Sequence, residues 1–177
     1  MDISEILAKY DSDKVTVHYY GPTYDGLFRR FDRNKDLDVL EIGVQRGGSL
    51  MAWAEYFPHA RVTGVDIVDV RDPRYRSDRV TFILGDIKEV PLEGTFDIII
   101  DDGSHMLPDV LAALKKGLPL LKPGGIIVIE DVQHPKSWVW NTAKIAGIGR
   151  LLTGKFFYRD LRKIKGGFDD FLIIVKK

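Results

Sequence analysis

The chain has 177 residues, 45% of them hydrophobic, and its 26 basic residues balance its 26 acidic ones. This length and composition suit one globular domain, and the balanced charge gives no general sign of a nucleic-acid or membrane-surface partner. The absence of cysteine excludes disulfides and thiolate metal sites, and it fits a cytoplasmic protein.

The N-terminal part of the chain predicts two short helices, over residues 2–10 and 22–32, on either side of a polar and aromatic segment. Residues 1–5 lack a basic region followed by an apolar stretch, so we expect no signal peptide. No apolar run approaches the ~20 residues of a membrane span. In the aromatic segment, His18 and Tyr19 are equally consistent with packing over a sheet and with a cofactor or substrate role.

From residue 36 onward, short apolar runs alternate with helical segments. Helices are predicted over residues 49–56 and 107–121, and strands over residues 38–42, 61–67, 80–84, 96–101 and 125–130. Near the end, residues 155–162 and 168–175 flank Gly166-Gly167 and predict an antiparallel hairpin. This order predicts an α/β protein with a mostly parallel sheet covered by helices.

The first predicted strand runs into a glycine-rich turn over residues 41–49, EIGVQRGGS. Such a turn lets the backbone approach a ligand and aims N–H groups at a carboxylate or phosphate. The dinucleotide pattern Gly-x-Gly-x-x-Gly is missing, because Gln45 stands where its second glycine should be, and this weakens an NAD interpretation. Asp66 ends the second strand, where it could accept hydrogen bonds from ribose hydroxyls, and Asp86 after the third could meet an adenine amino group.

Two acidic motifs end the fourth and fifth predicted strands. The first is the run FDIIIDDGSH over residues 96–105, and Glu130-Asp131 follows 25 residues later. Because parallel strands end at one edge of a sheet, acid oxygens and an imidazole could converge there, which suits a hard cation and a base. The plainer alternative is a set of solvated acids at strand ends.

Within the first motif, Asp101 and Asp102 are neighbours near a strand end, so one side chain should face the site and the other should point elsewhere. His105 is predicted to lie in the first turn of a helix that Ser104 can cap. The helix dipole would lower the basicity of this imidazole and nearby carboxylates would raise it. A neutral imidazole is available at pH 7 in either case.

Four aromatic residues lie outside these motifs. Trp53 and Tyr56 follow the glycine-rich turn at helical spacing, which favours core packing. Trp138 and Trp140 could stack on a sugar or ring substrate, or could anchor an oligomer interface. The stretch that contains them, residues 138–154, is predicted to be either a helix or a mobile lid.

In their order and spacing, these motifs resemble the class I S-adenosylmethionine-dependent methyltransferases over roughly residues 38–131. The motifs that carry the resemblance are EIG at 41–43, GVDI at 64–67, GD at 85–86, FDI at 96–98 and LKPGG at 121–125. The resemblance implies a Rossmann-like, doubly wound, mostly parallel seven-stranded sheet with a C-terminal antiparallel hairpin. It implies one domain, with a helical cap over residues 1–35, a cofactor-binding core over 36–135, and a lid and closing hairpin over 136–177.

The same resemblance implies that S-adenosylmethionine binds along the glycine-rich turn and the strand ends. The residues it assigns to the cofactor are Glu41, Gly43, Gln45, Gly47, Ser49, Asp66, Ile67, Asp86, Ile87 and Asp101.

Within that superfamily the chain is similar to the metal-dependent sugar O-methyltransferases of macrolide tailoring, the macrocin and mycinamicin type. The carriers are DDGSH at 101–105, IEDV at 129–132 and SDK at 12–14, with His18-Tyr19 and Tyr24. This resemblance implies Mg²⁺ on Asp102, Glu130 and Asp131, and His105 as the base. The macrolide enzymes carry a further N-terminal domain, so the resemblance does not imply the acceptor.

We therefore expect a Mg²⁺-dependent O-methyltransferase that acts on a hydroxyl of a sugar or glycosylated substrate, such as a glycan, a nucleotide sugar or a natural product. One alternative is methylation of a catechol-like diol. Another is a nucleic-acid methyltransferase that uses residues 136–177, with ten lysines and arginines against three aspartates, although the neutral overall charge counts against it. The third is a non-catalytic S-adenosylmethionine-binding module. A homo-oligomer that completes the substrate pocket stays open.

Overall fold

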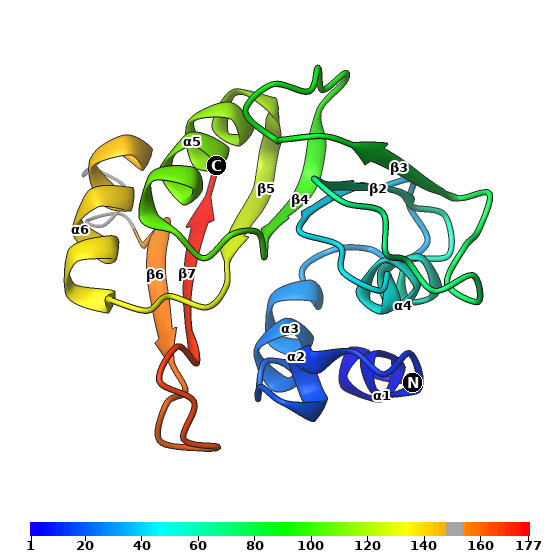
Figure 1. Ribbon diagram of the computed structural model, residues 1–177, viewed down its shortest axis with the longest axis horizontal. Helices are drawn as coiled ribbons and strands as arrows, with labels where there is room; N and C mark the ends of the chain where they lie inside the picture. The colour runs from blue at the N-terminus through cyan, green and yellow to red at the C-terminus, as the bar shows by residue number, and fades with distance from the viewer. Residues whose placement is uncertain (148–153) are drawn as a thin grey trace.

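A computed structural model of the protein describes residues 1–147 and 154–177 (Figure 1). Its seven strands form one sheet in the order β3-β2-β1-β4-β5-β7-β6. The strands are β1 (Asp38–Ile42), β2 (Arg61–Asp66), β3 (Val80–Leu84), β4 (Phe96–Asp101), β5 (Leu121–Ile129), β6 (Phe156–Asp160) and β7 (Phe171–Lys176). The strands β1 to β5 pair in parallel, and β7 runs antiparallel between β5 and β6. The predicted mostly parallel seven-stranded sheet with a C-terminal antiparallel hairpin is confirmed.

Helices cover both faces of this sheet (Figure 1). They are α1 (Ile3–Lys9), α2 (Asp13–Thr16), α3 (Gly21–Phe28), α4 (Gly48–Tyr56), α5 (Leu107–Leu120) and α6 (Pro135–Ala146). One apolar cluster joins α1, α3 and α4 to one face, and a second cluster joins α5 and α6 to the other. In β4, Ile98 and Ile100 face the first cluster and Ile99 faces the second. Burial on both faces explains why this strand is a continuous apolar run in the sequence.

The central strands end at one level, and this brings their following residues together. Ile42 lies opposite Asp101 in the register of β1 and β4, and Asp101 lies opposite Ile129 in β5. The Asp102 N–H donates to the Ile42 carbonyl at 2.8 Å, and the Glu130 N–H donates to the Asp101 carbonyl at 2.9 Å. The acidic motifs of two strands therefore emerge beside the glycine-rich turn.

The predicted position of His105 in a helix is wrong. Helix α5 begins at Leu107, with Met106 as its N-cap residue and a proline in its first turn. Proline at this position favours the start of a helix. His105 lies two residues earlier in a left-handed conformation, with φ of 53°. Ser104 does not cap the helix as predicted, and its hydroxyl instead donates to the Asp109 carboxylate at 2.7 Å.

Smaller differences concern the ends of elements. The strand predicted over residues 125–130 begins at Leu121, because Leu121 already pairs with Phe96 before a register shift, and it ends at Ile129. The stretch predicted as helix or lid contains the last part of α6, where Trp138 is buried and Trp140 is half exposed. The rest of that prediction falls on residues 148–153, which lie outside the described residues. Within residues 1–147 and 154–177, no helix combines the length and the apolar content that crossing a membrane requires.

Candidate active site

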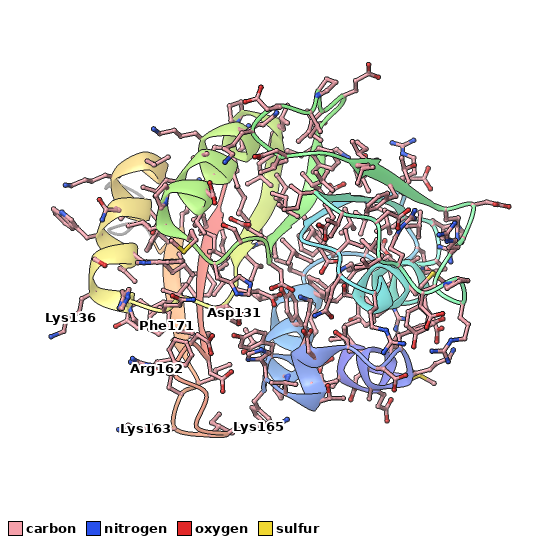
Figure 2. All side chains as sticks on the ribbon, in the orientation of Figure 1. Asp131, Lys136, Arg162, Lys163, Lys165 and Phe171 are labelled. Carbon is pink, nitrogen blue, oxygen red and sulfur yellow. The ribbon has the colours of Figure 1, made fainter. Side chains whose placement is uncertain are left out.

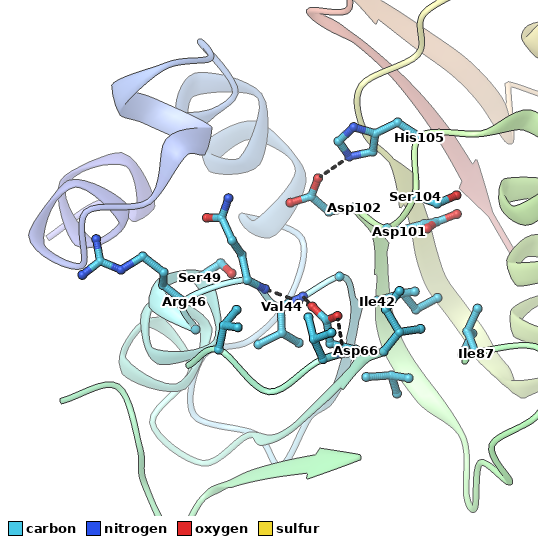
Figure 3. Close-up of a pocket in the computed structure, with 18 of the residues that line it drawn as sticks. Ile42, Val44, Arg46, Ser49, Asp66, Ile87, Asp101, Asp102, Ser104 and His105 are labelled. Carbon is cyan, nitrogen blue, oxygen red and sulfur yellow. Dashed lines mark hydrogen bonds and ion pairs between the residues drawn. The ribbon is translucent and has the colours of Figure 1, made fainter. Parts of the chain in front are cut away.

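A cavity of about 450 Å³ lies where β1, β2 and β4 end, beside the glycine-rich turn (Figure 3). It brings together most of the residues predicted to bind a cofactor. Those that line it are Gly43, Gln45, Gly47, Ser49, Asp66, Ile67, Asp86, Ile87 and Asp101. Asp102, His105 and Asp131 line the same cavity.

Glu41 does not line this cavity. Successive side chains of a strand face opposite sides of a sheet, so Glu41 points away from the side on which Ile42 borders the cavity. Its carboxylate is fully buried and accepts hydrogen bonds from the Ser49 hydroxyl at 2.8 Å and the Trp53 indole N–H at 3.1 Å. Burial raises the pKa of Glu41 to about 7. Glu41 therefore links β1 to α4 through these two hydrogen bonds.

Asp66 shapes the glycine-rich turn. Its Oδ2 atom accepts hydrogen bonds from the backbone N–H groups of Val44, at 2.7 Å, and Gln45, at 3.1 Å (Figure 3). Gln45 is held in the left-handed region, with φ of 47°. The turn then enters α4 through Gly47, whose φ is 86° and which supplies no side-chain cap. The N-terminus of α4 faces the cavity and suits an anionic group.

Asp101 and Asp102 point in different directions (Figure 3). The Asp101 Oδ2 atom is buried and has no hydrogen-bond partner among the described residues. Burial, followed by the charge of Asp102, raises the pKa of Asp101 to about 7. Because a buried carboxylate oxygen without a partner is costly, Asp101 offers the cavity an acceptor for a cationic or hydrogen-bonding ligand group.

Asp102, His105 and Asp131 form a compact group of possible ligands, with atoms that all lie within 4.8 Å of one another. The His105 Nε2 atom lies 3.2 Å from Asp102 Oδ1 and 3.4 Å from Asp131 Oδ2. The hydrogen bond to Asp102 raises the pKa of His105 above its usual value of 6.5. His105 and Asp131 are both left-handed, with φ of 53° and 52°. Such backbone is uncommon outside glycine and often marks functional sites.

Glu130 does not belong to that group and does not line the cavity. One of its oxygens accepts a hydrogen bond from the Tyr24 hydroxyl, and the other lies 2.9 Å from Lys14 Nζ. Lys14 comes from α2, and its side chain is 1% exposed. Its ammonium group also lies 2.5 Å from Asp102 Oδ2 and 3.4 Å from Glu41 Oε1. Burial alone would lower the pKa of Lys14, but these carboxylates hold it well above its usual value.

The segment between α1 and α3 thus provides an outer layer of hydrogen-bond donors for the acidic motifs. The Tyr20 hydroxyl donates to the Asp131 carboxylate, and the His18 ring stacks on the Tyr20 ring with 4.8 Å between the ring centroids. His18 Nδ1 lies 2.5 Å from the buried carboxylate of Asp170, which precedes β7. Tyr19 is 40% exposed and does not line the cavity.

Lys14, Tyr20 and Asp170 are not among the site residues predicted from the sequence. Lys14 belongs to the SDK motif and Tyr20 to the aromatic segment, which were the available signals. Asp170 belongs to no recognisable motif. Its contact with His18 could not be predicted, because the two residues lie 152 positions apart in the chain.

The chemistry of these residues fits a divalent cation. Carboxylate oxygens are the ligands that Mg²⁺ prefers. Burial and the charge of Asp102 raise the pKa of Asp131, and burial raises that of Glu130 well above its usual value. The ligand atoms of Asp102, His105 and Asp131 lie close enough together for one cation to be held between them.

The basic C-terminal segment lies away from the cavity. Figure 2 shows Lys136 and Lys163 projecting at the edge of the molecule, on α6 and the loop between β6 and β7. Arg162 pairs with Asp160, and Lys165 donates to the Val15 carbonyl at 2.7 Å. None of the described residues in 136–147 and 154–177 lines the cavity.

Comparisons with known proteins identify similar chains. Residues 40–132 match a family model described as a methyltransferase domain. Mycinamicin VI 2''-O-methyltransferase of Micromonospora griseorubida is 36% identical over 146 residues, which cover 74% of this chain and 36% of that protein. Demethylmacrocin O-methyltransferase of Streptomyces fradiae is 35% identical over 146 residues, covering 74% and 36%.

Among solved structures, the chain is similar to the MycE methyltransferase from the mycinamycin biosynthetic pathway in complex with Mg and SAH. The TM-score is 0.75 at 27% identity, covering 99% of this chain and 55% of that one. A further MycE complex, with Mg, SAH and mycinamycin VI, has a TM-score of 0.71 at 29% identity and covers 99% and 54%. The chain therefore spans about a third of the length of these curated relatives and about half of the length of the MycE chain.

Proposed function

The chain belongs to the family of methyltransferase domains, and on that premise we propose that it is a Mg²⁺-dependent S-adenosylmethionine O-methyltransferase acting on a hydroxyl of a sugar or glycosylated substrate. The observation that carries the proposal is the gathering of Asp102, His105 and Asp131 at the edge of a cavity bordered by a glycine-rich turn. The relatives named for O-methylation of glycosylated natural products support this class of acceptor.

In this proposal the cavity holds S-adenosylmethionine, which supplies the methyl group. The backbone of the glycine-rich turn and the N-terminus of α4 would bind its carboxylate. The unpartnered oxygen of Asp101 would accept a hydrogen bond from its amino group. Asp66 would contact the ribose, while Asp86 and Ile87 would contact the adenine.

Asp102 and Asp131 would hold the divalent cation, with Glu130 as the third carboxylate of the predicted set. When bound, Mg²⁺ lowers the pKa of an acceptor hydroxyl and orients it. His105 would then take the hydroxyl proton on Nε2, in the tautomer whose ring hydrogen is on Nδ1. Its distances to Asp102 and Asp131 support this role, because a hydroxyl held beside these carboxylates lies within proton-transfer reach.

Incubation with labelled S-adenosylmethionine and Mg²⁺ tests the proposal against panels of nucleotide sugars, oligosaccharides, glycosylated natural products and catechol-like diols. We expect label on a sugar hydroxyl, loss of transfer in excess chelator and recovery when Mg²⁺ is restored. Full transfer in chelator would contradict the metal requirement. Transfer to diols alone would favour the catechol alternative, and cofactor binding in calorimetry with no transfer to any panel would favour a binding module. A cytoplasmic location and a homo-oligomer stay predictions.

Asp66→Asn is expected to weaken S-adenosylmethionine binding by about tenfold, since two N–H groups of the turn lose a charged acceptor and such bonds contribute about 1.5–3 kcal/mol. Calorimetry with the cofactor measures the change. Asp69→Asn is the matched control, because Asp69 follows the same strand but pairs with Arg71 at the surface. Equal affinity in Asp66→Asn and wild type would show that the turn does not need this carboxylate.

A further inference from the structure

Lys14 is a buried cation that contacts the carboxylates that follow β4 and β5, with Glu41 of β1 at 3.4 Å. Its ammonium group lies 2.5 Å from Asp102 Oδ2 and 2.9 Å from Glu130 Oε2, and the Lys14 and Glu130 side chains are each 1% exposed. Among the described ion pairs, no other lysine or arginine reaches Asp102, Glu130 or Asp131. Two of the three carboxylates proposed to hold Mg²⁺ therefore already share one cation of the chain.

The contacts of Glu130 set it apart from the other two proposed ligands. Lys14 and the Tyr24 hydroxyl engage one oxygen each, and Glu130 is missing from the group of ligand atoms that lie within 4.8 Å of one another. Asp102 has one oxygen on Lys14 and one facing His105. Both oxygens of Glu130 are therefore engaged, by Lys14 and Tyr24, whereas Lys14 engages only one oxygen of Asp102.

We propose that Lys14 is a positioning residue that competes with the divalent cation for Asp102 and Glu130 and thereby sets the metal affinity of the site. This inference rests on the proposed function, because it requires that the site bind a divalent cation. A cation held by Asp102 lies close to the Lys14 ammonium, and like charges in a buried site repel strongly. The Lys14 to Glu130 ion pair also has to yield before Glu130 can turn to a metal ion.

This competition predicts the sign of a mutational effect. Without Lys14, the buried carboxylates lose their cation, so the metal-free protein becomes less stable. A divalent cation would then relieve more repulsion between carboxylates and would meet no ammonium beside it. Lys14→Met should therefore bind metal more tightly, whereas a lysine that only orients its partners would leave weaker binding when removed, as loss of an orienting partner usually does.

Calorimetric titration of the full chain with MgCl₂, and separately with MnCl₂, is expected to give a Kd at least tenfold lower for Lys14→Met than for wild type. The variant should also have a lower Tm without metal and a larger rise in Tm on adding Mg²⁺. Lys9→Met is the matched control, because Lys9 pairs with Glu55 on the exposed face of α1 and should leave the Kd unchanged. An equal or higher Kd in Lys14→Met would overturn the inference while leaving the proposed function intact. Absence of metal binding by the wild type would overturn both.

A measurement on the wild type keeps the inference testable if Lys14→Met does not fold. In protein labelled with ¹³C at lysine Cε, the Lys14 signal is expected to shift in step with the metal saturation measured by calorimetry. The Lys9 signal should stay in place. A Lys14 signal that does not move while Mg²⁺ saturates the site would show that the ammonium keeps its carboxylate partners. This result would overturn the proposed competition.

Discussion

His105→Gln is expected to lower kcat by about 10²–10⁴-fold, the usual contribution of a general base, while the Kd for S-adenosylmethionine stays near the wild-type value. The imidazole is the group at the cavity edge that can take a proton between two carboxylates, at 3.2 Å from Asp102 and 3.4 Å from Asp131. Glutamine keeps the size and polarity of the side chain but cannot accept the proton. Single-turnover transfer of labelled methyl to the best acceptor measures the loss.

The pH profile provides an independent check on this role. The hydrogen bond that the protonated His105 ring donates to Asp102 raises the pKa of His105 above its usual value of 6.5, and a base acts in its neutral form. Activity should therefore fall as pH drops through the pKa of His105, and this acid limb of the pH profile should be absent in His105→Gln. His59→Gln changes an exposed histidine and serves as the control. Wild-type activity in His105→Gln, with the limb intact, would assign the base elsewhere.

Gly43→Ala is expected to lower the free energy of unfolding by at least about 3 kcal/mol, in the range of the more severe core substitutions. Gly43 has φ of 83°, and a Cβ there would run into the backbone of Asp102, with the Gly103 Cα only 2.9 Å away. Backbone cannot yield as a side-chain tip can, so either β1 or the acidic motif must shift. A shift of Asp102 would also weaken metal binding and methyl transfer.

The matched control is Gly94→Ala, since Gly94 has a similar φ of 80° but nothing within 4 Å of a Cβ. It should cost only the strain of the left-handed conformation, about 1–2 kcal/mol. Urea unfolding with an unchanged m-value measures both costs. Equal costs in the two variants would show that the approach of Asp102 to Gly43 does not limit stability.

The sheet and the strand-end acids could be predicted from the sequence because both depend on local pattern. Alternating apolar runs and helices indicate a parallel sheet, and parallel strands end at one edge. The alternation of side chains along a strand also indicates that Glu41 points away from the cavity. It lies one residue before Ile42 on a strand, so the two side chains face opposite sides and only Ile42 borders the cavity.

The outer donors could not be predicted, because their contacts cross most of the chain. Lys14 reaches Glu130 over 116 residues and Tyr20 reaches Asp131 over 111 residues. No periodicity links such positions. The conformation of His105 was missed for a different reason, because it depends on the exact residue at which α5 begins. Met106 is the N-cap residue, so His105 lies just outside the helix and has a left-handed backbone.

These long separations also bear on how the protein folds. Lys14 and Tyr20 can donate to the acidic motifs only after the segment before β1 has docked against residues more than a hundred positions further along the chain. His18 meets Asp170 across 152 residues. Contacts of such high sequence separation form slowly, because loop closure precedes any gain from packing. The sheet and the glycine-rich turn can therefore assemble first. During refolding, the spectroscopic signal of the native strands should return before methyl-transfer activity does.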